Sequence, residues 1–262
     1  MARSSLPSSE GASTAPSETS PQTRIAAAKP PLEHPRIIRL ASVDSTQRHA
    51  ADLAAGGAAD GTVVVAETQT AGRGRRGRVW RDVPGASVLM SVVLRTSLAP
   101  ARVPTLSLAA GVAVAEALID ATGVDARLKW PNDVLIDGRK VAGLLLERHG
   151  DVVILGIGIN VTRGAVPAAL AAQATSIVGQ GGCADREVIL AAVVDAVTGW
   201  RARLERDGFD PVRARWTVLA AMLGQRVTVD GITGTALGLD ADGALLLESA
   251  QGVVRLLAGE VT

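Results

Sequence analysis

The sequence predicts an α+β fold in two parts, a larger region of mixed strands and helices followed by a small all-β unit. Apolar runs of strand length, such as 87–94 and 152–161, alternate with segments near 106–119 and 185–207 whose apolar residues recur at helical spacing. From Gln225 onward, short strands are separated by Asp-Gly turns. Such turns are typical of a small β-barrel.

The chain divides into three segments by composition. Residues 1–34 are rich in Ser, Ala, Pro and Thr and are expected to form a disordered tail, because they cannot bury enough apolar surface to offset their ordering entropy. Residues 35–221 are expected to form the main domain and residues 222–262 the C-terminal unit, with the boundary near Met222. Strands are expected at 37–40, 62–66, 87–94, on both sides of Pro131 in 127–136, and at 140–147, 152–161, 226–229, 234–239, 244–248 and 253–257. Helices are expected from 44 or 45 to 55, from 104 to 119, from 185 to 207 and from 211 to 221.

Composition limits the classes of function. Hydrophobic residues make up 47% of the chain and the formal net charge is +1, so any basic cluster is a local feature and not part of a basic face. One Phe and no Tyr argue against a stacking platform for single-stranded nucleic acid. A single cysteine, Cys183, fits a reducing compartment. Without an apolar run of about 18 residues or a signal core, a soluble, cytoplasmic protein is expected.

The most distinctive stretch is the arginine loop, residues 69–81, which follows the strand at 62–66. It has three glycines between 72 and 77 and five arginines between Arg73 and Arg81. The glycines let backbone N–H groups approach a ligand, and the guanidinium groups bind anions. At about 4 Å and an effective dielectric constant of about 20, one charge pair is worth roughly 4 kcal/mol. We therefore expect a loop that is poorly ordered until an anion binds. The glycine spacing matches neither a P-loop nor a dinucleotide fingerprint.

Three downstream segments also carry polar groups where strands end. Residues 129–133 read Lys-Trp-Pro-Asn-Asp, residues 138–143 place Lys140 at the mouth of a hairpin, and the apolar strand at 152–161 includes Gly-Ile-Gly-Ile-Asn, ending at Asn160. Taken singly, these residues have structural explanations as a surface charge, a turn cap and a strand end.

Together, in this order and spacing, the arginine loop and these segments closely resemble biotin protein ligases, the enzymes that biotinylate the carrier domains of acyl-CoA carboxylases. The resemblance runs from about Ser45 to Asn160, and its specific motifs are Gly-Arg-Gly-Arg-Arg-Gly-Arg-x-Trp and Lys-Trp-Pro-Asn-Asp. It implies a mixed β-sheet with helices on one face, like that of class II synthetases, and an SH3-like C-terminal barrel. It also implies the short form of the family, because the tail shows no pattern for a DNA-binding helix-turn-helix.

The resemblance implies an ATP-dependent reaction in two steps. The biotin carboxylate attacks the α-phosphate of ATP and forms biotinyl-5′-AMP, and a carrier lysine then attacks this anhydride and releases AMP. A cationic loop that closes over both anions offsets their repulsion and shields the water-labile adenylate.

The resemblance also implies three groups of site residues. The biotin-binding group is Ser45, Thr46, Gln47, Gln69, Arg73, Gly74, Arg75 and Lys140. The ATP-binding group is Arg75, Arg78, Trp80, Lys129, Asn132, Asp133 and Asn160. The catalytic group is Arg73, Arg75, Lys140, Lys129 and Asp133. Asp133 is also the implied Mg²⁺ ligand, either directly or only through the phosphates. One departure is Gln47, which stands where the family usually has Asn.

The implied partner is the biotin carboxyl carrier domain of an acyl-CoA carboxylase. Neither DNA nor a membrane is expected as a partner, and the protein is expected to be a monomer or a weak homodimer. A lipoate (octanoate) ligase of the same fold is the nearest alternative, disfavoured by the intact motifs and the small β unit. A repressor of biotin genes would need a DNA-binding domain, and a nucleic-acid module built on the arginine loop would bind with steep salt dependence. The three histidines show no metal-ligand spacing with Cys183.

Overall fold

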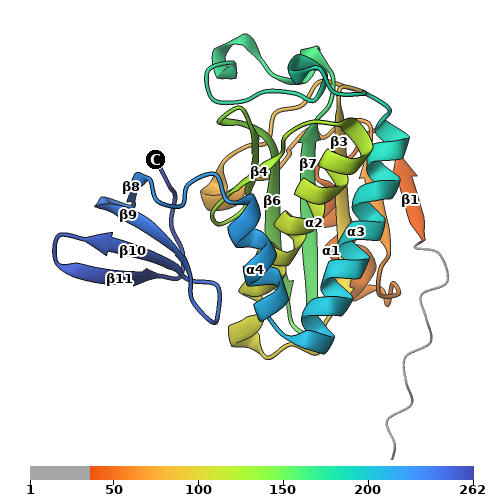
Figure 1. The fold of residues 1–262 in the computed structure, drawn as a ribbon. Coiled ribbons are helices and arrows are strands. Elements are labelled where there is room, and N and C mark those ends of the chain that lie inside the picture. The colour runs from red at the N-terminus through yellow and green to blue at the C-terminus, as the bar shows by residue number, and fades with distance from the viewer. Residues whose placement is uncertain (1–35) are drawn as a thin grey trace, which may run out of the picture. The chain divides into compact units, whose positions relative to one another are not determined.

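A seven-stranded mixed sheet forms the main part of the computed structural model, which describes residues 36–262 (Figure 1). The predicted tail, 1–34, lies outside the described residues. The strands are β1 (Ile37–Leu40), β2 (Val63–Ala66), β3 (Ser87–Arg95), β4 (Arg127–Lys129), β5 (Asp133–Ile136), β6 (Arg139–His149) and β7 (Val152–Asn160). Their order is β1-β2-β3-β7-β6-β5-β4, and only the β1–β2 pair is parallel.

Four α-helices accompany this sheet: α1 (Thr46–Ala55), α2 (Pro104–Thr122), α3 (Arg186–Asp207) and α4 (Asp210–Leu219). Figure 1 shows α2, α3 and α4 as one layer against the sheet. Val63 and Val65 belong to the core under this layer, whereas Val64 packs with α1. Because successive side chains of a strand point to opposite faces, α1 lies on the other face. The expectation of helices on one face therefore describes the three-helix layer, and α1 is the exception.

The helix boundaries follow local sequence signals. The Asp185 carboxylate caps α3 by accepting the backbone N–H groups of Glu187 and Val188. Gly123 ends α2 with φ of 74°, a conformation that glycine adopts without a Cβ penalty. Ser45 occupies the N-cap position of α1 as expected, but its side chain makes no capping hydrogen bond. The Ser45 hydroxyl is therefore free of a capping role.

Helix α2, with the turn before it, spans Pro100–Thr122 and is long and apolar enough to cross a membrane by length and composition alone. The lack of an uninterrupted apolar run of about 18 residues in the sequence predicts no membrane span. Most of this segment is buried against the sheet, α3 and α4. Its apolar surface is therefore explained by a place in the protein core.

The C-terminal unit is a four-stranded antiparallel sheet in the order β11-β10-β9-β8. Its strands are β8 (Arg226–Val229), β9 (Ile232–Leu239), β10 (Leu245–Ser249) and β11 (Gly252–Leu256). The small β unit is confirmed; among the described residues no β8–β11 pairing closes it into a barrel. Its apolar residues join the core of the main sheet, and the Trp130 indole N–H donates to the Gly243 carbonyl oxygen at 3.2 Å. The proposed boundary at Met222 falls between α4 and β8.

Acid should weaken the C-terminal sheet through Asp240. Partial burial raises the pKa of its carboxyl, but hydrogen bonds from Asp242, the Arg255 guanidinium and the Ala244 backbone outweigh burial and lower the pKa to about 2. The folded-state pKa lies below the ordinary 3.8, so the stabilisation is present above about pH 4 and is lost as pH falls through 2. We expect Asp240→Asn to lower the free energy of unfolding by about 1 kcal/mol at pH 6, because asparagine keeps the backbone contacts and loses the charge pair.

Urea unfolding at pH 6 and at pH 2 tests this expectation. Asp195→Asn, on the exposed side of α3, is the matched control and should have no effect at either pH. An Asp240→Asn penalty that is the same size at pH 2 would contradict the electrostatic explanation.

Candidate active site

Three glycines let other side chains lie directly on the backbone of the sheet face opposite α2. We call this surface the glycine floor. Gly143 of β6 and Gly158 of β7 are register partners, and Gly156 lies two residues before Gly158. A Cβ at 158 would lie 2.6 Å from the Trp80 ring, and one at 143 would lie 2.7 Å from the Lys140 ammonium nitrogen. These positions need glycine because other side chains lie directly on the backbone there.

The start of α1 forms a polar pocket at one end of this floor. The Gln69 side-chain oxygen accepts the Thr46 backbone N–H at 2.8 Å and the Thr46 hydroxyl at 3.1 Å. The Gln47 amide N–H₂ donates to the carbonyl oxygens of Ile154 at 3.0 Å and Leu145 at 3.4 Å. The Ser45 hydroxyl is buried and has no hydrogen-bond partner. A buried polar group without a partner costs free energy, so the pocket suits a polar ligand.

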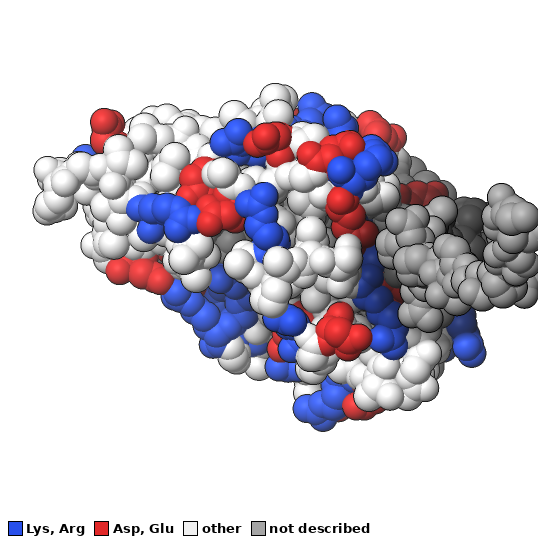
Figure 2. All heavy atoms as spheres, turned by 90° about the horizontal axis from the view of Figure 1, so that it is seen from below, with Lys and Arg blue, Asp and Glu red and all other residues white. Residues whose placement is uncertain are grey.

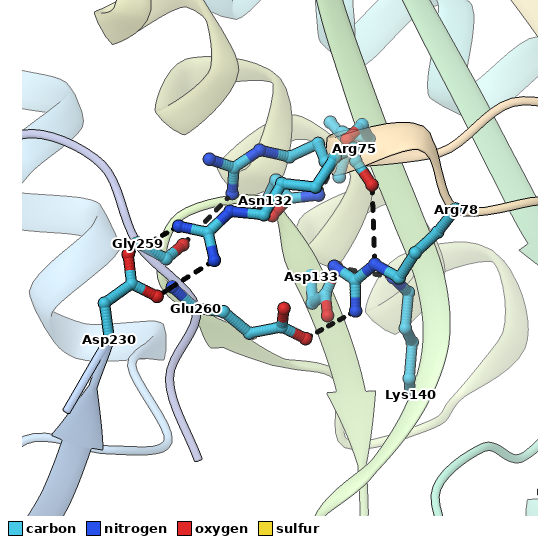
Figure 3. Close-up of polar contacts among 10 residues, drawn as sticks. Arg75, Arg78, Asn132, Asp133, Lys140, Asp230, Gly259 and Glu260 are labelled. Carbon is cyan, nitrogen blue, oxygen red and sulfur yellow. Dashed lines mark hydrogen bonds and ion pairs between the residues drawn. The ribbon is translucent and has the colours of Figure 1, made fainter.

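The arginine loop is held by carboxylates that are distant in sequence (Figure 3). Arg73 pairs with Glu147 of β6 at 2.6 Å. Arg76 pairs with Asp230 and Arg78 pairs with Glu260, both in the C-terminal unit. The expectation of a loop that is poorly ordered until an anion binds assumed unpaired charges, whereas the fold supplies these acidic partners. Arg76 itself has φ of 56°, within a short 3₁₀ turn at Arg75–Gly77.

Arg75 is the most desolvated cation of the loop. Its guanidinium donates to the Asn132 side-chain oxygen at 2.9 Å and to the Gly259 carbonyl oxygen at 3.5 Å. Burial lowers the pKa of Arg75 below its ordinary value, and the neighbouring charge of Arg76 lowers it further. An anion next to this half-buried guanidinium would relieve that cost.

Lys140 and Trp80 meet above the glycine floor. The Lys140 ammonium lies 2.6 Å from an Asp133 carboxylate oxygen and 5.7 Å from the centre of the Trp80 ring, within reach of a cation–π interaction. The Trp80 indole N–H is buried and has no partner. Lysine, carboxylate and indole thus form a compact charged corner beside the loop.

The end of β7 and the segment that follows it form another side of the site. Asn160 is buried, and its amide N–H₂ donates to the Thr175 carbonyl oxygen at 3.0 Å. Backbone hydrogen bonds also join Lys140 to Gln173 and Thr175. The segment 163–180, with three short 3₁₀ helices, therefore supports both Asn160 and Lys140. Its short polar and small residues carried no sequence signal for a part in the site.

One cavity of about 670 Å³ brings these parts together. Every candidate residue from the sequence lines it: Ser45, Thr46, Gln47, Gln69, Arg73, Gly74, Arg75, Arg78, Trp80, Lys129, Asn132, Asp133, Lys140 and Asn160. Ser91 and Glu260 also line it and were missed by the sequence reasoning. Ser91 could have been noticed as a lone polar residue inside an apolar strand, whereas nothing in the sequence links Glu260 to the loop.

The side chains of the cavity fit a metal ion that binds mainly through the phosphates of a ligand. Across residues 36–262, no group of three or more His, Cys, Asp or Glu side chains could hold a metal ion. Asp133 and Glu260 are carboxylates of the cavity lining, and Asp133 already pairs with Lys140. Mg²⁺ keeps several waters and is commonly bound by one or two carboxylates plus substrate phosphates. Asp133 could supply such a carboxylate.

The face of the molecule seen from below carries mixed charge. Figure 2 shows the side seen from below, where Lys and Arg are interspersed with Asp and Glu. Three arginines of the loop are also neutralised by acidic partners. A basic patch for phosphate backbones needs clustered, uncompensated charge.

The fold and cavity agree with comparisons to known proteins. The model of the Biotin/lipoate A/B protein ligase family matches residues 40–162, and that of the Biotin protein ligase C terminal domain matches residues 222–262. The chain belongs to the biotin/lipoate protein ligase family.

Within that family, the proteins to which the chain is similar include biotin ligases. The chain is 39% identical over 239 residues to the biotin--[acetyl-CoA-carboxylase] ligase of Paracoccus denitrificans, covering 85% of this chain and 98% of that protein. It is 36% identical to the bifunctional ligase/repressor BirA of Bacillus subtilis, covering 84% and 71%. The biotin protein ligase of Aquifex aeolicus in complex with biotin and ATP superposes with a TM-score of 0.79 at 32% identity, covering 87% and 97%.

Filling the glycine floor should disable the cavity. In Gly158→Ala the new methyl group would overlap the Trp80 ring, whose nearest atoms lie 2.6 Å from an ideal Cβ. Such overpacking costs about 1–3 kcal/mol. We therefore expect kcat/KM for biotin to fall about tenfold or more. Steady-state kinetics, with thermal unfolding to check the fold, measure this.

Gly199→Ala is the matched control, since nothing lies within 4 Å of a Cβ at that helical position. It should leave activity unchanged and raise helix stability slightly. Wild-type kinetics in Gly158→Ala would show that the Trp80 position over β7 is irrelevant to the site.

Proposed function

We propose that this chain is an ATP-dependent biotin ligase that forms biotinyl-5′-AMP and transfers biotin to a carrier-protein lysine. The observation that carries the proposal is the single cavity, in which a neutral polar pocket adjoins a wall of guanidinium and ammonium groups. An acid with a polar, uncharged head and an anionic tail fits such a gradient. The relatives and the family membership reported above support the same activity.

The polar pocket is proposed to bind the ureido ring of biotin. Ser45, Thr46 and Gln69 would contact the ring, which suits the buried Ser45 hydroxyl that lacks a partner. Gln47 would support the pocket from beneath, because its amide N–H groups are taken by backbone carbonyls. Lipoate carries a dithiolane ring without N–H or C=O groups. Lipoate bound in this pocket would therefore leave the polar groups of the pocket unpaired.

The arginine loop is proposed to hold the two reacting anions. Arg73, the Gly74 backbone and Arg75 would bind the biotin carboxylate and the α-phosphate, while Arg78 and Lys129 would bind the outer phosphates. Trp80, Asn132 and Asn160 complete the proposed nucleotide site. Glu147, Asp230 and Glu260 would release their arginines to the incoming phosphates.

In the proposed first step a biotin carboxylate oxygen attacks the α-phosphorus. A new P–O bond forms, the bond to the β-phosphate breaks and pyrophosphate leaves. No proton transfer is needed, so the protein's task is to hold two anions together. Guanidinium groups in a partly dehydrated site supply the stabilisation where charge develops. We propose that Mg²⁺ accompanies the triphosphate, with Asp133 its protein ligand.

In the second step the neutral lysine amine of the carrier attacks the acyl carbon, and the acyl–phosphate bond breaks to release AMP. Lys140 would stabilise the oxyanion and the departing phosphate. Asp133 would accept a proton from the amine once Lys140 turns toward the anhydride. We propose a biotin carboxyl carrier domain as acceptor and a cytoplasmic location, with the protein acting as a monomer or weak homodimer.

ATP–pyrophosphate exchange tests the first step. We expect exchange with biotin and Mg²⁺, at least a hundredfold less with lipoate, and loss on adding EDTA. Arg75→Ala should reduce exchange about a hundredfold, an effect typical of removing one donor from a developing anion. Arg139→Ala is the control, because Arg139 is an arginine outside the cavity lining, paired with Asp137.

Exchange that prefers lipoate would overturn the biotin assignment. Salt-sensitive nucleic-acid binding without any exchange would favour the binding-module alternative.

The proton transfer assigned to Asp133 has its own test. In Asp133→Asn, transfer from preformed biotinyl-5′-AMP to the carrier should slow about 10²- to 10⁴-fold and rise more steeply with pH. Single-turnover transfer at several pH values measures this. An unchanged rate and pH profile would remove the role of Asp133 as base.

A further inference from the structure

Ser91 lies on β3 at the bottom of the polar pocket, with its side chain fully buried. Its hydroxyl oxygen is 2.9 Å from the Thr46 hydroxyl and 3.2 Å from the Gln47 side-chain oxygen. Ser91 therefore stands between two residues assigned to the biotin end of the site. A hydroxyl has one proton to donate, so only one of these contacts can be a full hydrogen bond at a time.

The surrounding groups determine which atoms can donate. The Thr46 backbone N–H can only donate, so the Gln69 atom that it contacts is oxygen. The Thr46 hydroxyl also donates to this oxygen, and its single proton is thereby used. Thr46 can then only accept at its hydroxyl oxygen, and Ser91 donates to it.

Gln47 is oriented by the same reasoning. One end of its amide contacts the carbonyl oxygens of Ile154 and Leu145, which can only accept, so that end is the N–H₂ group. The other end is oxygen and faces Ser91. A Cβ at Gly156 would lie 2.5 Å from this oxygen, so glycine there gives Gln47 its place. Ser91 thus always has a second acceptor within reach.

We infer that Ser91 is a positioning residue that selects ligands carrying an N–H donor. A hydroxyl oxygen accepts at two lone pairs, so Thr46 can accept from Ser91 and from a ligand N–H at the same time. Because Ser91 donates to Thr46 and the Thr46 proton is used by Gln69, Thr46 offers the ligand only an acceptor. This inference rests on the proposed function and names the part of biotin that is read here, a ureido N–H.

A ligand without this N–H leaves the second lone pair of Thr46 without a donor. Sites built to pair a polar group discriminate strongly against analogues that lack it. Discrimination here depends on the Ser91 donor, which keeps the Thr46 hydroxyl turned toward Gln69, and not on Thr46 alone.

The test is ATP–pyrophosphate exchange by wild type and Ser91→Ala with three acids: biotin, desthiobiotin, and biotin methylated at the ureido nitrogens. Desthiobiotin keeps both N–H groups and lacks sulfur. We expect Ser91→Ala to raise KM about fivefold for biotin and for desthiobiotin, with kcat within twofold and KM for ATP unchanged. The preference for biotin over the methylated acid should shrink by the same factor.

Two further variants separate this role from packing. Ser87→Ala is the matched control, because Ser87 lies on the same strand and face, is buried, and its hydroxyl has no partner; KM for biotin should not change. Ser91→Cys keeps a weak donor of similar size and should recover part of the loss. If Ser91→Ala lowers the stability of the fold, Ser91→Cys still tests the inference.

The outcomes are distinguishable. If wild type exchanges with biotin but Ser91→Ala and Ser91→Cys leave its KM unchanged, the inference is wrong and the proposed function stands. A KM that rises equally for biotin and the methylated acid, or together with the KM for ATP, would also overturn it by indicating general damage. A wild type inactive with biotin would instead overturn the proposed function.

Discussion

Compensation of the arginine loop is the constraint on which the rest of the site depends. Five arginines within nine residues repel one another, and the fold offsets that repulsion with carboxylates from three other places in the chain: Glu147 on β6, and Asp230 and Glu260 in the C-terminal unit. Each of these exposed pairs is individually weak. Acting together, they pair three of the five arginines with carboxylates of the same chain; in the proposed function, phosphates replace these partners.

This arrangement joins the C-terminal unit to the arginine loop. The core of the unit is continuous with that of the main sheet, and Asp230 and Glu260 pair with loop arginines from it. The Gly259 carbonyl oxygen lies 3.5 Å from the Arg75 guanidinium. In the proposed function, a phosphate that takes Arg78 from Glu260 also breaks a contact with this unit, which would link loop closure to the C-terminal residues.

The two ends of the cavity differ in charge and burial. At the loop, exposed arginines pair with carboxylates of the chain, and in the proposed function they exchange these partners for ligand phosphates. At the start of α1, neutral groups are buried, and each unmet hydrogen bond is expensive. Ser91, Thr46, Gln47 and Gln69 meet this demand as one connected set. Glutamine at 47, where the resemblance leads one to expect asparagine, is accommodated because its amide spans from β7 to Ser91.

The sequence alone determined the element order and the small C-terminal β unit through short-range periodicity. It supplied the candidate site residues through the contiguous motifs that carry the resemblance to biotin protein ligases. Val63 to Ala66, the Asp185 cap and the Lys-Trp-Pro-Asn-Asp run are signals of this kind. Only the tertiary structure decided that α1 crosses to the opposite face, that the loop is compensated by Glu147, Asp230 and Glu260, and that Ser91 sits beneath Thr46. These facts depend on strand register and on contacts between residues far apart in the chain. Single residues such as Glu260 carry no local pattern that could announce their partner.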